Sequence, residues 1–399
     1  MSEVGFCELE GEASAVAAVL AERLPRFVGF PGDAVPTLAG LKAGVIGNGA
    51  VGRDIAVHLA RLQPAALWLC DRGRYKAESL LTQSIAPNEV GSPKATSTGR
   101  VCKAISPRTA VFVCDGAVED LPTTGFADAD VVALATDNLA AEVEVGQRCL
   151  WLGRPLVQAS VHGETLVAQV RYFTNREGGA CPACGFSGAE WAHLNRETSF
   201  SCEGATADRR ERQTTTLPTM SVSFLCGLAA NLACMQILRH VLNLGMPLTD
   251  SLVEYCGYTH RTVTASLTHN PECVCDHTTW ERRTAPAALR DCTPAQLAES
   301  AGLPLADVSF QVHGSVFAEL LICNKCGRSQ PGGRFVAPGQ SAGPCSDCGS
   351  PTRAAPFYSH DPVPAGLLPG GERSLGQLGA ESVGSVIVRG AGRAVWFRH

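Results

Sequence analysis

The sequence predicts an α/β protein whose core is a Rossmann-like, mostly parallel sheet with helices on both faces, followed by a small C-terminal zinc-ribbon domain. Three observations support this fold class. Short apolar runs alternate with amphipathic helical segments from Leu41 onward, which is typical of a parallel sheet buried on both faces. A glycine-rich turn joins the first apolar run to the first helix, and two Cys-x-x-Cys pairs follow near the C-terminus.

The predicted elements follow one another in the order that such a sheet needs. Helices are expected between consecutive strands, and a polar loop or crossover at 181–215 precedes an apolar helix at 219–244. Towards the C-terminus we expect a short helix at 294–302 and a hairpin at 308–327 that leads into the last cysteine pairs. The predicted strands are the apolar runs 43–47, 66–71, 110–115, 128–137, 155–163 and 165–173 and the alternating segments 251–269 and 382–399.

The composition is that of a globular protein with ample core. The chain has 399 residues, of which 45% are hydrophobic and 18% charged, and its formal net charge is −5. This balance argues against a nucleic-acid binder and leaves no polybasic patch for a membrane surface. We see no secretion signal, and the longest apolar stretch, 223–242, contains Asn231, Arg239 and His240. We therefore expect a cytoplasmic protein in which this stretch is a buried helix.

A phosphate-binding turn is predicted at Gly47, Gly49 and Gly52, which match G-x-G-x-x-G between a strand and a helix. Glycines let the backbone turn sharply and approach phosphate oxygens, while the helix N-terminus offers free N–H groups. Asp71 ends the next strand, 19 residues beyond Gly52, where a carboxylate can accept a hydrogen bond from a ribose hydroxyl. This pattern favours a bound nucleotide over a glycine-rich turn without a ligand.

Two further residues favour ATP over a nicotinamide cofactor. Lys94 ends the motif Gly-Ser-Pro-Lys, and Asp137 follows a predicted strand. An adenylating enzyme needs a cation for the phosphates and a carboxylate for Mg²⁺, whereas hydride transfer needs neither. Each residue also has a structural interpretation, because Lys94 could be a solvated surface residue and Asp137 a helix N-cap. An NAD(P)-dependent oxidoreductase is the alternative function for the same turn.

The 18 cysteines predict metal ligands before disulfides, because no export route is visible. Cys181 and Cys184 have the Cys-x-x-Cys spacing with which a tight turn offers two thiolates to one ion, and Cys273 and Cys275 follow a strand that can bring two more. A redox pair is the rival interpretation of the first motif. Near the C-terminus, a C-x₂-C-x₁₈-C-x₂-C pattern predicts a structural zinc ribbon, although an iron–sulfur cluster uses the same ligands. Its members are Cys323, Cys326, Cys345 and Cys348.

From about Leu41 to His277 the sequence resembles the superfamily of ubiquitin-activating enzymes and the bacterial ThiF–MoeB adenylyltransferases. The resemblance implies that ATP and Mg²⁺ are used to adenylate the C-terminal carboxylate of a ubiquitin-like or sulfur-carrier protein. It also implies a homodimer and, as a second partner, a downstream conjugating or sulfur-transfer enzyme. The motifs that carry the resemblance are GNGAVG at 47–52, Asp71, Gln83, GSPK at 91–94, ATDN at 135–138, CPAC at 181–184 and NPECVC at 270–275.

Residue roles follow from the same resemblance. The glycine turn, Asp71 and Gln83 are expected to hold the nucleotide, Lys94 to contact its phosphates, and Asp137 to support Mg²⁺ and the adenylation step. The resemblance also pairs Cys181 and Cys184 with Cys273 and Cys275 around a structural zinc ion. The expected domains are an N-terminal segment at 1–40, an adenylation domain at 41–284 with the embedded zinc site, and a zinc-ribbon-containing domain at 285–399.

One segment departs from the family pattern. The usual Asn-Leu-x-Arg-Gln is SLLTQ at 79–83, so Thr82 stands where the family has a phosphate-binding arginine. A guanidinium at this place would stabilise charge on the leaving pyrophosphate. Without a replacement, we expect a catalytically weak, nucleotide-binding zinc scaffold. The candidate replacements are Arg72 and Arg74 within the chain, and Arg23 and Arg26 from a partner subunit.

Cys202, in the predicted crossover loop, is the candidate nucleophile. Ubiquitin-activating relatives carry a thioester-forming cysteine in a comparable crossover, and a thiolate both attacks an acyl-adenylate and leaves readily. Nearby arginines at 196, 209, 210 and 212 would lower the pKa of this thiol. A free loop cysteine without chemistry is the alternative. The histidines at 162, 193, 269 and 277 show no ligand spacing and are expected to be structural.

Overall fold

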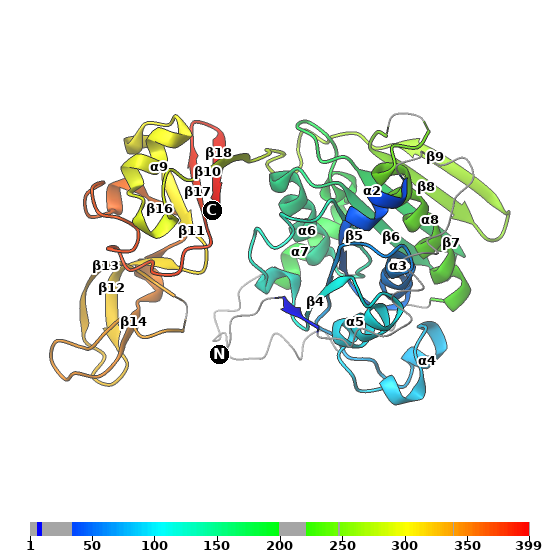
Figure 1. Ribbon diagram of the computed structural model, residues 1–399, viewed down its shortest axis with the longest axis horizontal. Helices are drawn as coiled ribbons and strands as arrows, with labels where there is room; N and C mark the ends of the chain where they lie inside the picture. Colours follow the sequence, from blue (N-terminus) through cyan, green and yellow to red (C-terminus); the bar gives the residue numbers. More distant parts are fainter. Residues whose placement is uncertain (1–5, 10–33, 199–220, 246–247, 338, 399) are drawn as a thin grey trace. The chain divides into compact units, whose positions relative to one another are not determined.

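The computed structural model describes residues 6–9, 34–198, 221–245, 248–337 and 339–398. The chain forms two compact units, the first ending at His277 and the second beginning at Thr278 (Figure 1). The boundary precedes β10 (Glu281–Thr284), because this strand pairs with the last strand, β18 (Arg393–Arg398). Residues 278–284, expected in the first domain, therefore belong to the second unit.

The described parts of the N-terminal segment belong to the first unit rather than to a separate body. β1 (Cys7–Glu8) pairs antiparallel with β4 (Ala110–Cys114). α2 (Ala34–Gly40) packs its apolar residues Ala34 and Leu38 against Leu242.

The first unit is built on a nine-stranded sheet in the order β1-β4-β3-β2-β5-β6-β7-β8-β9. From β4 to β6 neighbouring strands are parallel, and β7, β8 and β9 continue the sheet antiparallel. The parallel strands consist almost wholly of buried apolar residues, which is why their sequences show uninterrupted apolar runs. The strands are β2 (Lys42–Ile46), β3 (Ala66–Cys70), β4 (Ala110–Cys114), β5 (Val131–Leu134), β6 (Leu156–His162), β7 (Val167–Phe173), β8 (Ser251–Cys256) and β9 (Arg261–Ser266).

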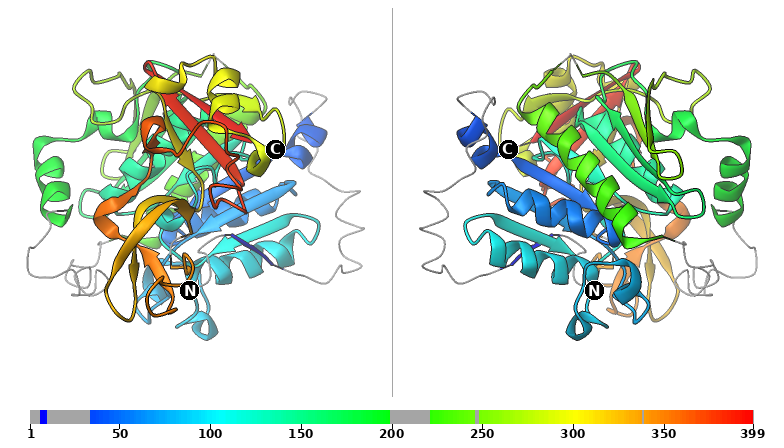
Figure 2. Two further views of the ribbon diagram at one scale, coloured as in Figure 1. Left: turned by 90° about the vertical axis from the view of Figure 1, so that its left-hand side faces the viewer. Right: turned by 90° about the vertical axis from the view of Figure 1, so that its right-hand side faces the viewer.

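Helices cover both faces of this sheet, as the sequence predicts. α3 (Ala50–Ala60) packs between α5 (Lys94–Ile105) and α8 (Ser223–Val241), and α6 (Leu139–Leu152) packs with α7 (Gly188–Thr198) on the opposite face (Figure 1). α8 has the length and mean hydropathy, 1.3, of a membrane span. It lies across β6 and β7 (Figure 2) and also packs against α3. Its residues Leu225, Ala229 and Ala233 are buried in the main core, so it is a core helix.

The strand order creates a switch point beside β2. The chain runs from β2 to β3 and β4 on one side, and then crosses to β5 and β6 on the other side. Loops that leave the carboxyl ends of β2, β3 and β5 therefore begin at one edge of the sheet, on either side of the switch point, which is where open α/β sheets bind ligands in a crevice.

The second unit combines a five-stranded sheet, in the order β10-β18-β17-β11-β16, with a smaller sheet that carries the last cysteines. The predicted hairpin at 308–327 is wrong: β11 (Ser309–Val312) pairs with β16 and β17, whereas β12 (Val316–Cys323) pairs in the other sheet. Both edges of β11 are occupied, so β12 has no edge to join. The remaining elements are α9 (Pro294–Ala301), β13 (Ser329–Val336), β14 (Thr352–Ala354), β15 (Ser359–His360), β16 (Val363–Pro364) and β17 (Ser385–Gly390).

Candidate active site and metal centres

The glycine turn at the end of β2 is sterically fixed. Gly47 has φ +84°, and a Cβ on it would lie 2.5 Å from the carbonyl oxygen of Ala135, which follows β5. A Cβ on Gly52 would lie 1.8 Å from the carbonyl oxygen of Gly47. Only glycine fits at these two places. The turn ends at Gly49, the N-cap of α3, so the first N–H groups of that helix open onto the crevice.

Asp71, the residue after β3, is held against the same turn. Its Oδ2 accepts a hydrogen bond of 2.6 Å from the N–H of Asn48, and its Oδ1 accepts one of 2.7 Å from the N–H of Gly73. A carboxylate oxygen has two acceptor sites, so each oxygen keeps one for a ligand hydroxyl. Asp71 therefore both orders the turn and presents a carboxylate at its edge.

Lys94 brings a cation to the glycine turn. It is the first residue of α5, and its N–H donates to the carbonyl of Gly73 at 2.9 Å. The Nζ atom lies 3.8 Å from the position that a Cβ on Gly49 would occupy. The ammonium group therefore lies over the N-terminus of α3, where the helix dipole also favours an anion. A solvated surface lysine does not describe this arrangement.

Asp137 lies at the end of β5, on the other side of the switch point from Asp71. The helix that follows is capped by Asn138, whose Oδ1 accepts from the N–H groups of Ala140 and Ala141 at 2.9 and 3.1 Å. Asp137 is therefore not the N-cap of α6. Asp137 is exposed.

Several buried polar atoms have no hydrogen-bond partner among the described residues. Asn48 is fully buried, and its Oδ1 has no hydrogen-bond partner among the described residues. Buried oxygens of Thr136, next to the glycine turn, and of Gln83, after α4 (Ser79–Thr82), likewise have none in the described chain. Buried oxygens without partners cost stability, so each one is a place for water or a ligand donor.

The predicted arginine replacements are only in part described. Arg74 is exposed, and its Nη1 donates to the carbonyl of Gly91 at 2.9 Å, so its guanidinium is attached to the Gly-Ser-Pro-Lys loop. Arg72 is exposed. Arg23, Arg26 and the candidate nucleophile Cys202 lie outside the described residues.

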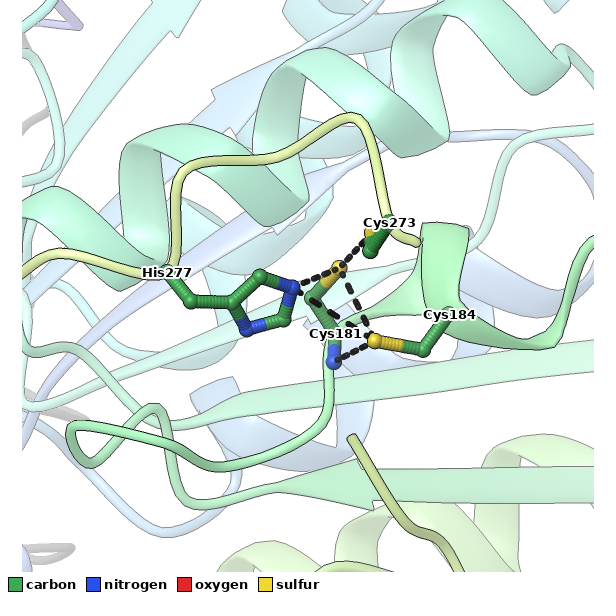
Figure 3. A group of neighbouring side chains, drawn as sticks. All are labelled: Cys181, Cys184, Cys273 and His277. Carbon is green, nitrogen blue, oxygen red and sulfur yellow. Dashed lines mark hydrogen bonds between the residues drawn. The ribbon is translucent and has the colours of Figure 1, made fainter. Parts of the chain in front are cut away.

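The first cysteine group has the geometry of a metal site. Ligand atoms of Cys181, Cys184, Cys273 and His277 all lie within 4.8 Å of one another (Figure 3). Sγ of Cys181 is 3.8 Å from that of Cys184 and 3.7 Å from that of Cys273, and His277 Nε2 lies 3.6 and 3.5 Å from the first two sulfurs. Tetrahedral zinc separates two sulfur ligands by roughly 3.8 Å and a sulfur and a nitrogen ligand by roughly 3.6 Å. These residues can hold zinc.

His277, rather than Cys275, completes this group, and the sequence did not predict it as a ligand. Its Nδ1 lies 2.8 Å from the carbonyl oxygen of Gly179, which fixes the tautomer with the proton on Nδ1 and a lone pair on Nε2. Cys275 lies against Cys181 and is buried with it, Leu150 and Ala183 in a small apolar cluster, but it is not one of the four residues whose ligand atoms group together.

The second cysteine group joins two turns of identical construction. Gly327 and Gly349, each one residue beyond a Cys-x-x-Cys pair, have φ of +70° and +68° and donate to the carbonyls of Cys323 and Cys345. The N–H groups of Cys326 and Lys325 donate to Cys323 Sγ and lower the pKa of that thiol to about 6. The sulfur separations between the turns are 3.5 Å for Cys323–Cys348 and 3.7 Å for Cys326–Cys345. This four-cysteine cluster has the form of a zinc ribbon.

Comparison with known proteins places the first unit in a family. The ThiF family model matches residues 23–275. Molybdopterin-synthase adenylyltransferase of Escherichia coli K12 is 24% identical over 248 residues, which is 61% of this chain and 90% of that protein. Adenylyltransferase and sulfurtransferase MOCS3 of Arabidopsis thaliana is 29% identical over 147 residues, 36% of this chain and 30% of that protein.

Among solved structures, E. coli MccB with ATP aligns with a TM-score of 0.48 at 15% identity, covering 61% of this chain and 68% of that one. The residues that the family model matches, 23–275, contain the glycine turn, Asp71, Lys94 and Asp137. Because the family model spans well over half of its residues, the chain belongs to the ThiF family and is an enzyme of the adenylyltransferase type.

Proposed function

We propose that this enzyme adenylates the C-terminal carboxylate of a ubiquitin-like or sulfur-carrier protein. A carboxylate oxygen attacks the α-phosphorus of ATP, the bond from this phosphorus to the bridging oxygen breaks, and pyrophosphate leaves with the electron pair. The observation that carries the proposal is the Lys94 ammonium over the N-terminus of α3, beside the end of β5 that bears Asp137. Hydride transfer would use neither charge there.

Each residue has a definite part in this proposal. The α3 N–H groups and Lys94 stabilise charge on the phosphates, and Asp71 takes a ribose hydroxyl. Mg²⁺ bound with the nucleotide would neutralise the phosphate oxygens, and Asp137 would support it. The buried oxygen of Gln83, which has no partner within the described residues, would accept a hydrogen bond from the ligand. Arg74, whose Nη1 donates to the carbonyl of Gly91, would contact the leaving pyrophosphate in place of the arginine that Thr82 replaces.

Zinc is proposed to bind both cysteine groups as a structural ion. In the first unit, Cys181, Cys184, Cys273 and His277 would hold it, and in the second unit the four ribbon cysteines would. All four positions of a tetrahedral ion are then filled by protein atoms, which leaves no open position for a reacting ligand. Their sulfur separations of 3.5–3.8 Å are far beyond a disulfide bond of about 2.05 Å.

Further parts of the proposal concern partners and location. A homodimer is supported by the outer face of α8, where Phe224 and Met235 are 74% and 59% exposed and lie on one side of the helix. Thioester formation at Cys202, transfer to a conjugating or sulfur-transfer enzyme, and a cytoplasmic location follow from the family resemblance.

The test combines ligand binding with one substitution. We expect Mg·ATP to raise the melting temperature of the protein and NAD⁺ and NADP⁺ to leave it unchanged, because only a ligand of the folded state stabilises it. With a panel of ubiquitin-like and sulfur-carrier proteins, pyrophosphate–ATP exchange should require one carrier. Asp137→Ala should reduce that exchange by at least about 100-fold with an unchanged melting temperature.

The outcomes separate the candidate functions. A shift with a nicotinamide cofactor alone would replace the adenylation proposal by an oxidoreductase. Binding of ATP without exchange with any carrier would favour the nucleotide-binding scaffold, which the serine and threonine at positions 79 and 82 support. Full exchange activity in Asp137→Ala would remove Asp137 from the mechanism.

A further inference from the structure

The hydroxyl group of Tyr75 uses its full hydrogen-bonding capacity beneath the glycine turn. Tyr75 is 1% exposed, and its hydroxyl lies 3.0 Å from the carbonyl oxygen of Asn48, 3.1 Å from Arg53 Nη1 and 3.0 Å from Thr98 Oγ1. A phenol has one proton and two acceptor sites. Since a carbonyl and a guanidinium cannot exchange roles, Tyr75 donates to Asn48 and accepts from Arg53 and Thr98.

This bond completes a three-point attachment of Asn48. The N–H of Asn48 donates to Asp71, its Nδ2 donates to the carbonyl of Cys70 at 3.1 Å, and its carbonyl accepts from Tyr75. In a trans peptide the C=O and the following N–H point in opposite directions. Fixing the Asn48 carbonyl on Tyr75 therefore directs the Gly49 N–H away from Tyr75, at the open N-terminus of α3.

An ion pair between the buried Arg53 and the half-buried Glu89 holds Tyr75 and the Lys94 segment together. Arg53 Nη2 lies 2.8 and 3.0 Å from the two carboxylate oxygens of Glu89, and Ser97 donates to the same carboxylate. Glu89 immediately precedes the loop that ends at Lys94, and Lys94 Nζ lies 5.9 Å from the centre of the Tyr75 ring. Substitutions in this network would therefore change the positions of the glycine turn and of Lys94.

We propose that Tyr75 is a positioning residue that holds the Asn48–Gly49 peptide in the orientation that presents the Gly49 N–H to the phosphates of the nucleotide. The inference rests on the proposed ATP-dependent function and adds a residue that no motif contains. Two observations carry it: the saturated hydroxyl under the turn, and the fully buried Asn48 whose Oδ1 is without a partner in the described chain.

The test compares nucleotides that differ in their phosphates. Affinities of the full-length protein for Mg·ATP and for adenosine are measured by calorimetry in the wild type and in Tyr75→Phe. The ring stays, so the packing is kept and only the hydroxyl is lost. We expect the affinity for ATP to fall about tenfold or more, because the Gly49 N–H no longer points at the charged phosphates. The affinity for adenosine, which has no phosphates, should stay the same.

Ser106→Ala is the matched control. Ser106 is fully buried at the far end of α5, and its hydroxyl lies 3.0 Å from Gln63 Oε1 and 2.5 Å from Thr109 Oγ1. Its loss removes hydrogen bonds of similar number without touching the turn. We expect a lower melting temperature with an unchanged ratio of ATP to adenosine affinity. A purely structural role of Tyr75 would give this same result for Tyr75→Phe, and that would overturn the proposal.

Two further outcomes are decisive. If the wild type binds adenosine and ATP equally, the proposed function and this inference fail together, whereas a normal wild-type preference that Tyr75→Phe retains overturns the inference alone. If Tyr75→Phe does not fold, the double variant Arg53→Gln/Glu89→Gln is used instead. It removes the ion pair that holds the Tyr75 hydroxyl in place but keeps the hydroxyl itself. This variant should lose part of the ATP preference, and an unchanged preference would overturn the proposal.

Discussion

Glu142 is a buried carboxyl group in the helix that follows β5, and it belongs to no sequence motif. It lies in the first turn of α6, only 8% exposed. Burial raises its pKa to about 7, and a hydrogen bond from Gln158 and the charge of Arg171 only partly oppose that rise. Glu190 and Asp137 add to it through their negative charges. Near neutral pH this side chain therefore changes its charge beside the predicted catalytic aspartate.

Glu142→Gln should change how stability depends on pH. Because the folded-state pKa lies above the ordinary value of 4.5, the stabilisation from the neutral carboxyl is complete below pH 4.5 and is lost as pH rises through 7. The loss amounts to about 3 kcal/mol. Urea unfolding at pH 5, 7 and 9 should show the wild type falling by about this much relative to Glu142→Gln.

Glu164→Gln is the control for this pH series. Glu164 is exposed at the turn between β6 and β7, so its replacement should leave the pH dependence of stability as in the wild type. Parallel stability curves for the wild type and Glu142→Gln would show that Glu142 is solvated or paired in solution.

At the scale of single residues, sequence reasoning finds groups within motifs and misses their partners. Asp71 and Lys94 come from motif spacing, and the structure brings both to the glycine turn. Sequence reasoning does not find Tyr75, Arg53 or Glu142, because no local motif contains them. Arg53, for example, contacts Tyr75 and Glu89, which are 22 and 36 residues away in the sequence. Only the folded sheet determines such contacts.

At the scale of elements, the metal loop shows why the spacing of Cys273 and Cys275 left His277 out of the expected ligand set. The spacing of Cys273 and Cys275 is that of two ligands on one side of an extended chain. The segment is instead a turn, with the N–H of Cys273 on the carbonyl of Asn270, and His277 adopts a positive φ of 49°. A non-glycine residue in this conformation is strained, and the bond to Gly179 helps to hold it there.

This geometry predicts that zinc in the first unit depends on His277 and not on Cys275. We expect two zinc ions per chain in the wild type and in Cys275→Ala, measured by elemental analysis of protein dialysed against a weak chelator. His277→Ala should retain about one, because three ligands leave the ion open to the chelator.

The ribbon gives the control for the zinc measurement. Cys345→Ser should lose the other ion and keep the one in the first unit, so the two sites are counted separately. Loss of zinc in Cys275→Ala with retention in His277→Ala would restore the four-cysteine set that the sequence predicted.

Among the larger elements, the sequence predicts what is periodic or continuous. The apolar runs of β2 to β6 and the alternating pattern of β8 and β9 are each found as strands. The same patterns do not predict which strands pair with one another. β11 and β12 are neighbours in sequence but lie in different sheets, because β16 and β17, more than 50 residues further on, take both edges of β11.

At the scale of the whole molecule, each unit has its own core and its own metal centre. The first core has buried members from Leu41 to Ile237, and that of the second unit runs from Leu289 to Phe397. One cysteine group lies in each unit. Nucleotide binding and the ribbon are therefore expected to stabilise different parts of the chain.

Calorimetry of the full chain tests this division. We expect two unfolding transitions. Mg·ATP should raise only the transition of the first unit, because it binds only that folded unit, and a 100-fold excess over its dissociation constant adds about 2.7 kcal/mol. Cys345→Ser/Cys348→Ser should lower only the other transition, because a zinc ribbon draws its folding energy from the metal. A single transition whose temperature shifted with both changes would mean that the ribbon-bearing unit is energetically coupled to nucleotide binding. The ribbon would then contribute to adenylation instead of being independent of it.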